Sequence, residues 1–165
     1  MKNLSLTFTV LVFNLLLFSC SVEEDYSISE AYNSDNFNVV YEPIDYEILE
    51  FINIHRAMLN LQPLELLNEA SKEAISHNYY MIDEGTVSHD FFFLRSQNLI
   101  DAVDAKKVLE NVGFGFYNAQ SVVDAWLDSD GHRQNIENPN VTNIGISSTH
   151  DENGKYYFTN IFVKL

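Results

Sequence analysis

The chain has 165 residues, 46% of them hydrophobic with 12 Phe and 9 Tyr, which suffices for one domain with a sizeable core and excludes a disordered protein. The formal net charge of −15 at pH 7 excludes nucleic acid as a partner, because phosphate backbones are bound by basic stripes and this sequence has none. The same charge opposes adsorption to an anionic membrane surface.

The first 19 residues have the pattern of a secretory signal peptide. Lys2 supplies a positive start, and the largely apolar run from Leu4 to Phe18 is too short to span a bilayer comfortably. Residues 17–20, Leu-Phe-Ser-Cys, resemble the bacterial lipobox, in which the cysteine is lipidated and becomes the new first residue. We therefore predict a lipid on Cys20 that anchors the protein to a membrane; the alternative is an ordinary thiol in a leader. Cys20 is the only cysteine, so an internal disulfide is excluded.

Residues 20–42 are predicted to form a flexible acidic tether. They are rich in Ser, Asn, Asp and Glu without a sustained period, and a flexible chain of this length spans on the order of 25 Å. Residues 23–25, Glu-Glu-Asp, resemble the acidic signals that send lipoproteins to the cell surface in some Gram-negative bacteria. The alternative is a solvated linker.

The folded domain is expected over residues 43–165 and begins with a helix at Pro43, a residue that suits the first turn. One face repeats apolar residues at steps of three and four: Ile44, Ile48, Phe51, Ile52, His55 and Leu59. Asn53 and Arg56 lie off this stripe, where either side chain can tie the helix to a neighbouring loop.

A second helix is predicted to bury Leu67, Ala70, Ala74, His77 and Met81 and to end near Gly85. His55 and His77 both fall on apolar faces, and we interpret both as structural residues.

A polar loop, residues 86–90, follows this helix and carries His89. The adjacent Asp90 either orients the imidazole ring or caps the next segment. The three phenylalanines of residues 91–93 are expected to pin the loop to the domain, and residues 95–105 are expected to form a third helix with Leu99 and Val103 inward.

Residues 107–116 are the most informative strand candidate, because the two-residue period places Glu110 in an apolar row. A buried carboxylate without a partner costs several kcal/mol, so Glu110 needs a donor, and a histidine is the expected one. The alternative is that Glu110 lies at the ragged start of the strand and faces water.

The next helix carries Trp126 on its apolar face, and Asp130-Gly131 is expected to end it through a positive φ at glycine. His132 would then lie just past the corner, with one more helical turn over residues 133–137.

Two strands, residues 143–149 and 156–163, joined by a hairpin turn over residues 151–154, are expected to close the fold. The last strand is apolar on both faces, which requires helices on both sides of the sheet. The fold class is therefore predicted to be α/β, a three-layer α-β-α sandwich with a small, mainly antiparallel sheet.

A series of short motifs in order along the chain resembles the CAP superfamily, the SCP-like extracellular domains of cysteine-rich secretory, antigen 5 and pathogenesis-related proteins. The motifs are Asn53-x-x-Arg56, Leu61-x-Pro63-Leu64, Ser88-His89, Glu110-Asn111, Val122-x-x-x-Trp126, Ser129-x-Gly131-His132-Arg133-x-Asn135-Ile136, Asn138-Pro139 and Ile144-Gly145. The resemblance covers roughly residues 45–165.

The resemblance implies an α-β-α sandwich with a cleft where two histidines and two glutamates converge. His89, Glu110 and His132 match three of the four. Ser129 stands where the second glutamate belongs, as is usual in the short bacterial branch of the family, and Leu109 replaces the common glycine before Glu-Asn.

These three residues suggest two kinds of chemistry. His89 and His132 are candidate ligands of a divalent metal such as zinc, and Glu110 would either complete the site or hold one ring by a hydrogen bond. The sequence has no His-Glu-x-x-His helix typical of metallopeptidases. Ser129 is a weak candidate for a nucleophile because no elbow motif surrounds it, and a helix cap explains it equally well.

The leading hypothesis is an extracytoplasmic, envelope-tethered binding module without enzymatic activity, whose cleft takes a small ligand, a peptide or a divalent metal. The second is a weak metal-assisted hydrolase or peptidase in which His89, Glu110 and His132 are catalytic. The third is a structural or adhesive surface protein that binds a partner through its loops.

Overall fold

The structure is a computed structural model that describes residues 39–165. The predicted signal peptide, the lipidation of Cys20 and the tether as far as residue 38 lie outside these residues. Contacts with the domain begin before the expected boundary at Pro43, because the Tyr41 hydroxyl lies 3.0 Å from Asn68 Oδ1 and 2.9 Å from Ser71 Oγ. Among the described helices, none combines the length and the hydropathy needed to cross a bilayer.

A four-stranded sheet in the order β1-β3-β4-β2 forms the middle layer. Its strands are β1 (Glu65–Leu66), β2 (Lys107–Phe114), β3 (Asn143–His150) and β4 (Tyr156–Lys164). The short β1 is parallel to β3, and the other pairs are antiparallel. Strand β2 is therefore one edge of the sheet. At the other edge β1 covers only the first two residues of β3, and it was not predicted because two residues carry no periodic signal.

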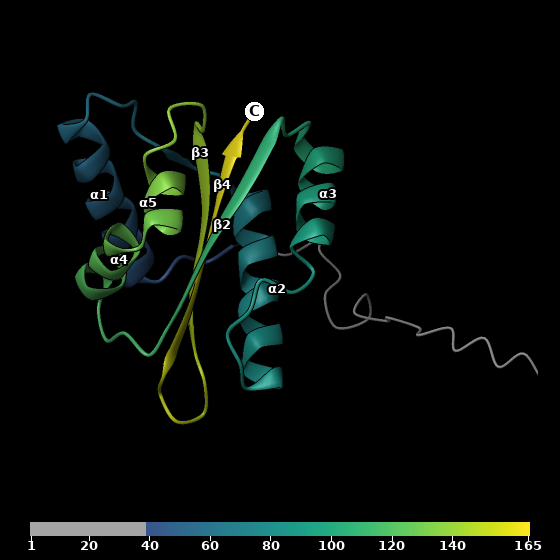
Figure 1. Ribbon diagram of the computed structural model, residues 1–165. Helices are drawn as coiled ribbons and strands as arrows, with labels where there is room; N and C mark the ends of the chain where they lie inside the picture. Colours follow the sequence, from purple (N-terminus) through teal and green to yellow (C-terminus); the bar gives the residue numbers. More distant parts are fainter. Residues whose placement is uncertain (1–38) are drawn as a thin grey trace, which may run out of the picture. The chain divides into compact units, whose positions relative to one another are not determined.

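Helices cover both faces of this sheet (Figure 1). Helices α1 (Pro43–Met58), α4 (Ala119–Asp128) and α5 (Asp130–Ile136) lie on one side, and α2 (Asn68–Glu84) and α3 (Phe92–Val103) lie on the other. This arrangement confirms the predicted three-layer α-β-α sandwich with a mainly antiparallel sheet.

Apolar side chains fill the space on both sides of the sheet. The larger core joins α1 and α4 to the sheet through residues that include Ile48, Ile52, Trp126, Ile144, Phe158 and Phe162. A smaller one joins α2 and α3 to the other face. There α2 approaches β3 so closely that a Cβ atom added to Gly145 would lie 2.1 Å from the carbonyl carbon of Ala70. Only glycine fits at that position.

Arg56 lies inside the α1 stripe and not off it as predicted, since its side chain is fully buried. Its guanidinium donates hydrogen bonds to the carbonyls of Gln62, Ile136 and Asn138, and these backbone acceptors compensate the buried charge. Asn53 exchanges two hydrogen bonds with the backbone of Leu64. Both side chains therefore tie α1 to loops, as expected.

The boundary between α4 and α5 differs from the prediction. The break occurs at Ser129, whose backbone is extended, and not at Asp130-Gly131. Gly131 lies inside α5 without a positive φ, so His132 belongs to the first turn of that helix and does not follow a corner.

The helix predicted at residues 95–105 runs from Phe92 to Val103. Phe93 is 74% exposed, so its side chain does not pin the preceding loop to the domain. Phe91 does so instead, with its ring 5.3 Å from that of Tyr80 in an edge-to-face arrangement.

Candidate functional site

A cluster of charged and polar side chains lies at the edge strand β2, centred on Glu110. The Glu110 side chain points towards α2 and α3 and is nearly inaccessible, the residue being 6% exposed. It therefore does not face water, the alternative that the sequence left open. A carboxylate buried to this extent requires donors on both oxygens.

Two side chains supply those donors. Arg95, from α3, binds the carboxylate through both oxygens, with Nε 2.8 Å from Oε2 and Nη2 2.9 Å from Oε1. His89 donates from Nδ1 to Oε1 over 2.8 Å. Burial raises the pKa of Glu110, but the hydrogen bonds from His89 and Arg95 outweigh it, so that the pKa is lower than usual. Glu110 is therefore an anion at neutral pH.

Side chains of α2 and α3 hold the loop that carries His89. Gly85 ends α2 with φ +64°, a backbone conformation that favours glycine. The Nε2 atom of His77 donates to the Ser88 carbonyl over 2.8 Å, and Arg95 Nη1 donates to the Asp90 carbonyl over 2.7 Å. Burial, together with Arg95, lowers the pKa of His77. A buried neutral His77 is the structural residue that the sequence predicted.

His132 approaches the same place from the other side of β2. Asn111 donates to the carbonyl of His132 over 3.1 Å, and Asn135 donates to the Glu110 carbonyl over 3.1 Å and to Asn111 Oδ1 over 2.8 Å. These two asparagines clamp α5 against the strand edge. The rings of His89 and His132 lie 6.5 Å apart, centroid to centroid. Burial and the neighbouring His89 lower the pKa of His132.

The outer edge of β2 is closed by side chains and not by another strand. Asn135 binds the carbonyl of Glu110, and the indole of Trp126 donates to the carbonyl of Val112 over 2.8 Å. An open strand edge is prone to pair with other chains, and bonded carbonyls prevent such pairing.

The structure thus brings His89, Glu110 and His132 together, and it gives Ser129 no catalytic role. Ser129 occupies the N-cap position of α5, although its hydroxyl forms no capping hydrogen bond. No hydrogen bond joins Ser129 to His89 or His132 among the described residues, so the geometry does not make it a nucleophile.

Sequence reasoning missed Arg95, Asn111 and Asn135. Arg95 precedes Leu99 by four residues, which places it on the inward face of α3, and a buried carboxylate requires a cation. That combination was a usable signal. Asn111 and Asn135 belonged to the quoted motifs, but their spacing did not show that they would bind each other.

The donor set fits an exchangeable two-histidine metal site better than a structural one. Arg95 and His89 occupy both oxygens of Glu110, which leaves Nε2 of His89 and the ring of His132 as available ligands. The described residues contain no group of three or more His, Cys, Asp or Glu side chains arranged to hold a metal ion. Structural zinc sites usually have four protein ligands.

Known proteins share the sequence pattern and the fold of this chain. The profile of the CAP family, described as the cysteine-rich secretory protein family, matches residues 49–163. Among solved structures, an outer surface protein from Borrelia burgdorferi superimposes with a TM-score of 0.66 and 25% identity, covering 76% of this chain and 96% of that one. An extracellular protein containing an SCP domain from Bacillus anthracis superimposes with a TM-score of 0.65 and 24% identity, over 78% of this chain and 45% of that one.

Two Bacillus subtilis proteins are similar in sequence. The uncharacterized protein YkwD is 32% identical over 61% of this chain and 40% of its own length, and the uncharacterized membrane protein YlbC is 23% identical over 82% of this chain and 38% of its own length. The chain therefore spans about two fifths of the length of these relatives.

Proposed function

Since this chain belongs to the CAP family of cysteine-rich secretory proteins, we propose that it is an extracytoplasmic binding module whose cleft between His89 and His132 takes a divalent metal ion, or a small ligand or peptide that imidazoles recognise. The observation that carries the proposal is which ring nitrogen of His89 forms a hydrogen bond. Its Nδ1 is committed to Glu110, so Nε2 remains for a ligand, with the His132 ring beside it.

The arrangement resembles a prepared binding site because the ring orientation is set before a ligand arrives. A carboxylate on one ring nitrogen orients the ring and raises the basicity of the other nitrogen. Arg95 holds that carboxylate and also the loop of His89. A bound divalent cation would supply a Lewis acid at this position, while the chain itself contributes two nitrogen donors, of which that of His89 is held in place by Glu110.

The proposed location follows from the sequence and the relatives. A signal peptide of residues 1–19 and a lipid on Cys20 would place the domain outside the cytoplasm and attached to the bacterial envelope. The similar outer surface protein from Borrelia burgdorferi supports this location.

Zinc titration of the full-length chain in mild detergent tests the cleft. We expect one exchangeable site in calorimetry, weakened about tenfold or more in His89→Ala and in His132→Ala. His150→Ala is the matched control, because His150 is an exposed histidine on β3, away from the β2 edge of the sheet. If the double variant His89→Ala/His132→Ala binds zinc as the wild type does, the cleft is not the binding site.

A hydrolase remains the second candidate because His89, oriented by Glu110, has the arrangement of a general base. Assay of peptide and ester substrates with added zinc decides between the two. Turnover lost in both His89→Ala and His132→Ala would favour the hydrolase, and turnover unchanged in these variants would exclude a catalytic cleft.

A further inference from the structure

From Ile146 to His150, no described strand lies beside β3 on the edge away from β4, because β1 pairs only with Asn143 and Ile144. An open strand edge presents N–H and C=O groups that can pair with another chain. A hollow of about 360 Å³ lies beside this length of β3. Apolar packing therefore does not fill the edge, and its hydrogen-bonding groups decide whether a further strand can add.

Alternate residues of β3 direct their backbone groups to this open edge. The carbonyl of Ile144 accepts a hydrogen bond from the Leu67 amide, at the end of β1. Because the backbone groups of a strand alternate in direction with a period of two, Ile146 and Ser148 point to the same edge. Their amides are the next donors that an added strand would use.

A side chain of α2 accepts the first of these donors. The Ile146 amide donates to Ser71 Oγ over 3.0 Å, and Ser71 is fully buried. The Tyr41 hydroxyl, from the segment before α1, lies 2.9 Å from the same oxygen. Ser71 and Tyr41 therefore stand where the carbonyl of a neighbouring strand would otherwise accept.

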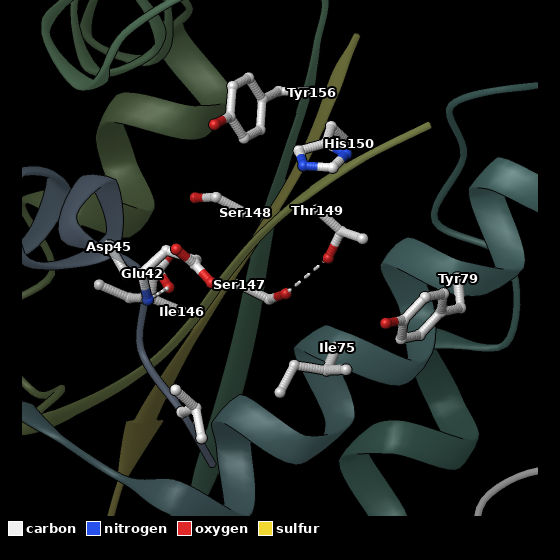
Figure 2. Close-up of a pocket in the computed structure, with 11 residues that line it drawn as sticks. Glu42, Asp45, Ile75, Tyr79, Ile146, Ser147, Ser148, Thr149, His150 and Tyr156 are labelled. Carbon is white, nitrogen blue, oxygen red and sulfur yellow. Dashed lines mark hydrogen bonds between the residues drawn. The ribbon is translucent and has the colours of Figure 1, made fainter. Parts of the chain in front are cut away.

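Asp45, in the first turn of α1, does the same for Ser148. Burial raises the pKa of Asp45, and hydrogen bonds to its carboxyl from the Ser148 hydroxyl, the Glu42 amide and the Ser148 amide offset part of that rise. The distance from the Glu42 amide to Oδ2 is 2.9 Å. Figure 2 shows Asp45 and Glu42 beside this part of β3. Asp45 thus joins the start of α1 to the open edge.

Charge at this edge also opposes the addition of a strand. Glu42 and Asp45 both line the hollow, and its lining contains no Lys or Arg. A second copy of this chain would bring a further net charge of −15 to the same place. Charged side chains that point at a sheet edge are a common protection against edge-to-edge pairing.

We propose that Tyr41, Asp45 and Ser71 form an edge guard, an autoinhibitory contact that keeps β3 from pairing with β3 of a second copy. The guard supplies acceptors to the two amides that such pairing would use. A second copy is the expected partner because two identical edges can pair antiparallel about a two-fold axis, which satisfies both at once. The guard lies at the opposite end of the sheet from the histidine cleft and does not depend on a ligand there.

Amide hydrogen exchange, followed by NMR on the full-length chain in mild detergent, tests the contacts. In the wild type we expect Ile146 and Ser148 to be protected from exchange, unlike Glu152 in the exposed hairpin turn. Asp45→Ala should speed exchange at Ser148, and Ser71→Ala should speed it at Ile146, each by about tenfold or more. If the two amides exchange in the wild type as freely as Glu152, the guard does not exist.

The double variant Asp45→Ala/Ser71→Ala tests self-association. We expect sedimentation in density-matched detergent to show a concentration-dependent dimer for this variant and a monomer for the wild type. Protection of Ile146 and Ser148 should return as the dimer forms, because β3 then pairs with β3. Asp101→Ala removes one exposed charge from α3 and is the matched control, expected to remain monomeric.

Two results would overturn the proposal. One is a folded double variant that stays monomeric up to about 0.5 mM, and the other is a dimer in which Ile146 and Ser148 remain unprotected. Should the double variant fail to fold, Ser71→Ala alone decides by the same two measurements, because it removes only a hydroxyl.

Discussion

At the scale of single residues, Arg95 determines the state of the cluster at β2. It neutralises Glu110 through two hydrogen bonds and holds the loop of His89 through the Asp90 carbonyl. The ion pair is buried, since Arg95 is 6% exposed. Removing one partner from a buried pair leaves an uncompensated charge, which costs far more than the loss of a surface pair.

We expect Arg95→Met to lower the free energy of unfolding by about 3–5 kcal/mol, measured by urea denaturation. Lys106→Met is the control, because Lys106 pairs with Asp104 at the surface and its loss should cost less than about 1 kcal/mol. Equal effects of the two substitutions would show that Glu110 does not depend on Arg95.

Glu110 also predicts how stability depends on pH. Its pKa in the folded protein is lower than its ordinary value of 4.5. The contribution of the ionised carboxylate to the free energy of unfolding is therefore present above about pH 4.5 and is lost as the pH falls through the folded pKa. Asp45 has a raised pKa and the opposite sign: its contribution is present below its ordinary value of 3.8 and is lost as the pH rises through its folded pKa.

Urea denaturation between about pH 7 and pH 3 checks this sign. We expect the wild type to lose stability below about pH 4.5 and Glu110→Gln to lose less over the same range, from a lower starting value. Asp45→Asn should instead steepen the acid-side decline, because the opposing contribution is gone. An acid-side slope in Glu110→Gln as steep as in the wild type would contradict the assignment.

At the scale of elements, two glycines differ in whether packing between a helix and a strand requires them. Gly145 of β3 has no room for a Cβ atom, because the backbone of α2 lies 2.1 Å from that position. Gly131 of α5 has nothing within 4 Å and no positive φ. The first glycine is required by packing, and the second is not required by its backbone.

We expect Gly145→Ala to destabilise the protein by about 1–3 kcal/mol or more, since α2 must move away from the sheet. Gly131→Ala should stabilise it by up to about 1 kcal/mol, because alanine is the better helix former. Thermal unfolding of both variants provides the measurement. Destabilisation by Gly131→Ala would contradict the helical backbone that the structure gives this residue.

At the scale of the whole molecule, the dominant feature is the net charge of −15. Like charges repel more strongly in the compact state than in the unfolded chain, and salt screens this repulsion. The few ion pairs described for this chain do not neutralise such an excess.

We therefore expect the urea midpoint of unfolding to rise when sodium chloride increases from about 0.02 M to about 0.5 M at neutral pH, a range over which the screening length falls severalfold. Sodium chloride is the suitable salt, because sulfate also strengthens apolar burial. A midpoint that falls with added chloride would mean that attractive ion pairs such as Arg95–Glu110 outweigh the general repulsion.

The sequence alone determined the layers, because the signals for helices and strands are periodic and local. Apolar steps of three and four predicted α1 and α2, and a last strand apolar on both faces predicted helices on both sides of the sheet. The positions of His89, Glu110 and His132 in the family motifs predicted that they would share a cleft, and the three side chains do lie together.

Only the tertiary structure decided what those side chains contact. Arg95 and Glu110 are 15 residues apart and Asn135 and Glu110 are 25 apart, and no local period relates them. Their hydrogen bonds depend on which face of α3 turns inward and on how closely α5 approaches β2. Strand β1 likewise pairs with only two residues of β3, because a strand's partners are set by packing across the sheet and not by its own sequence pattern.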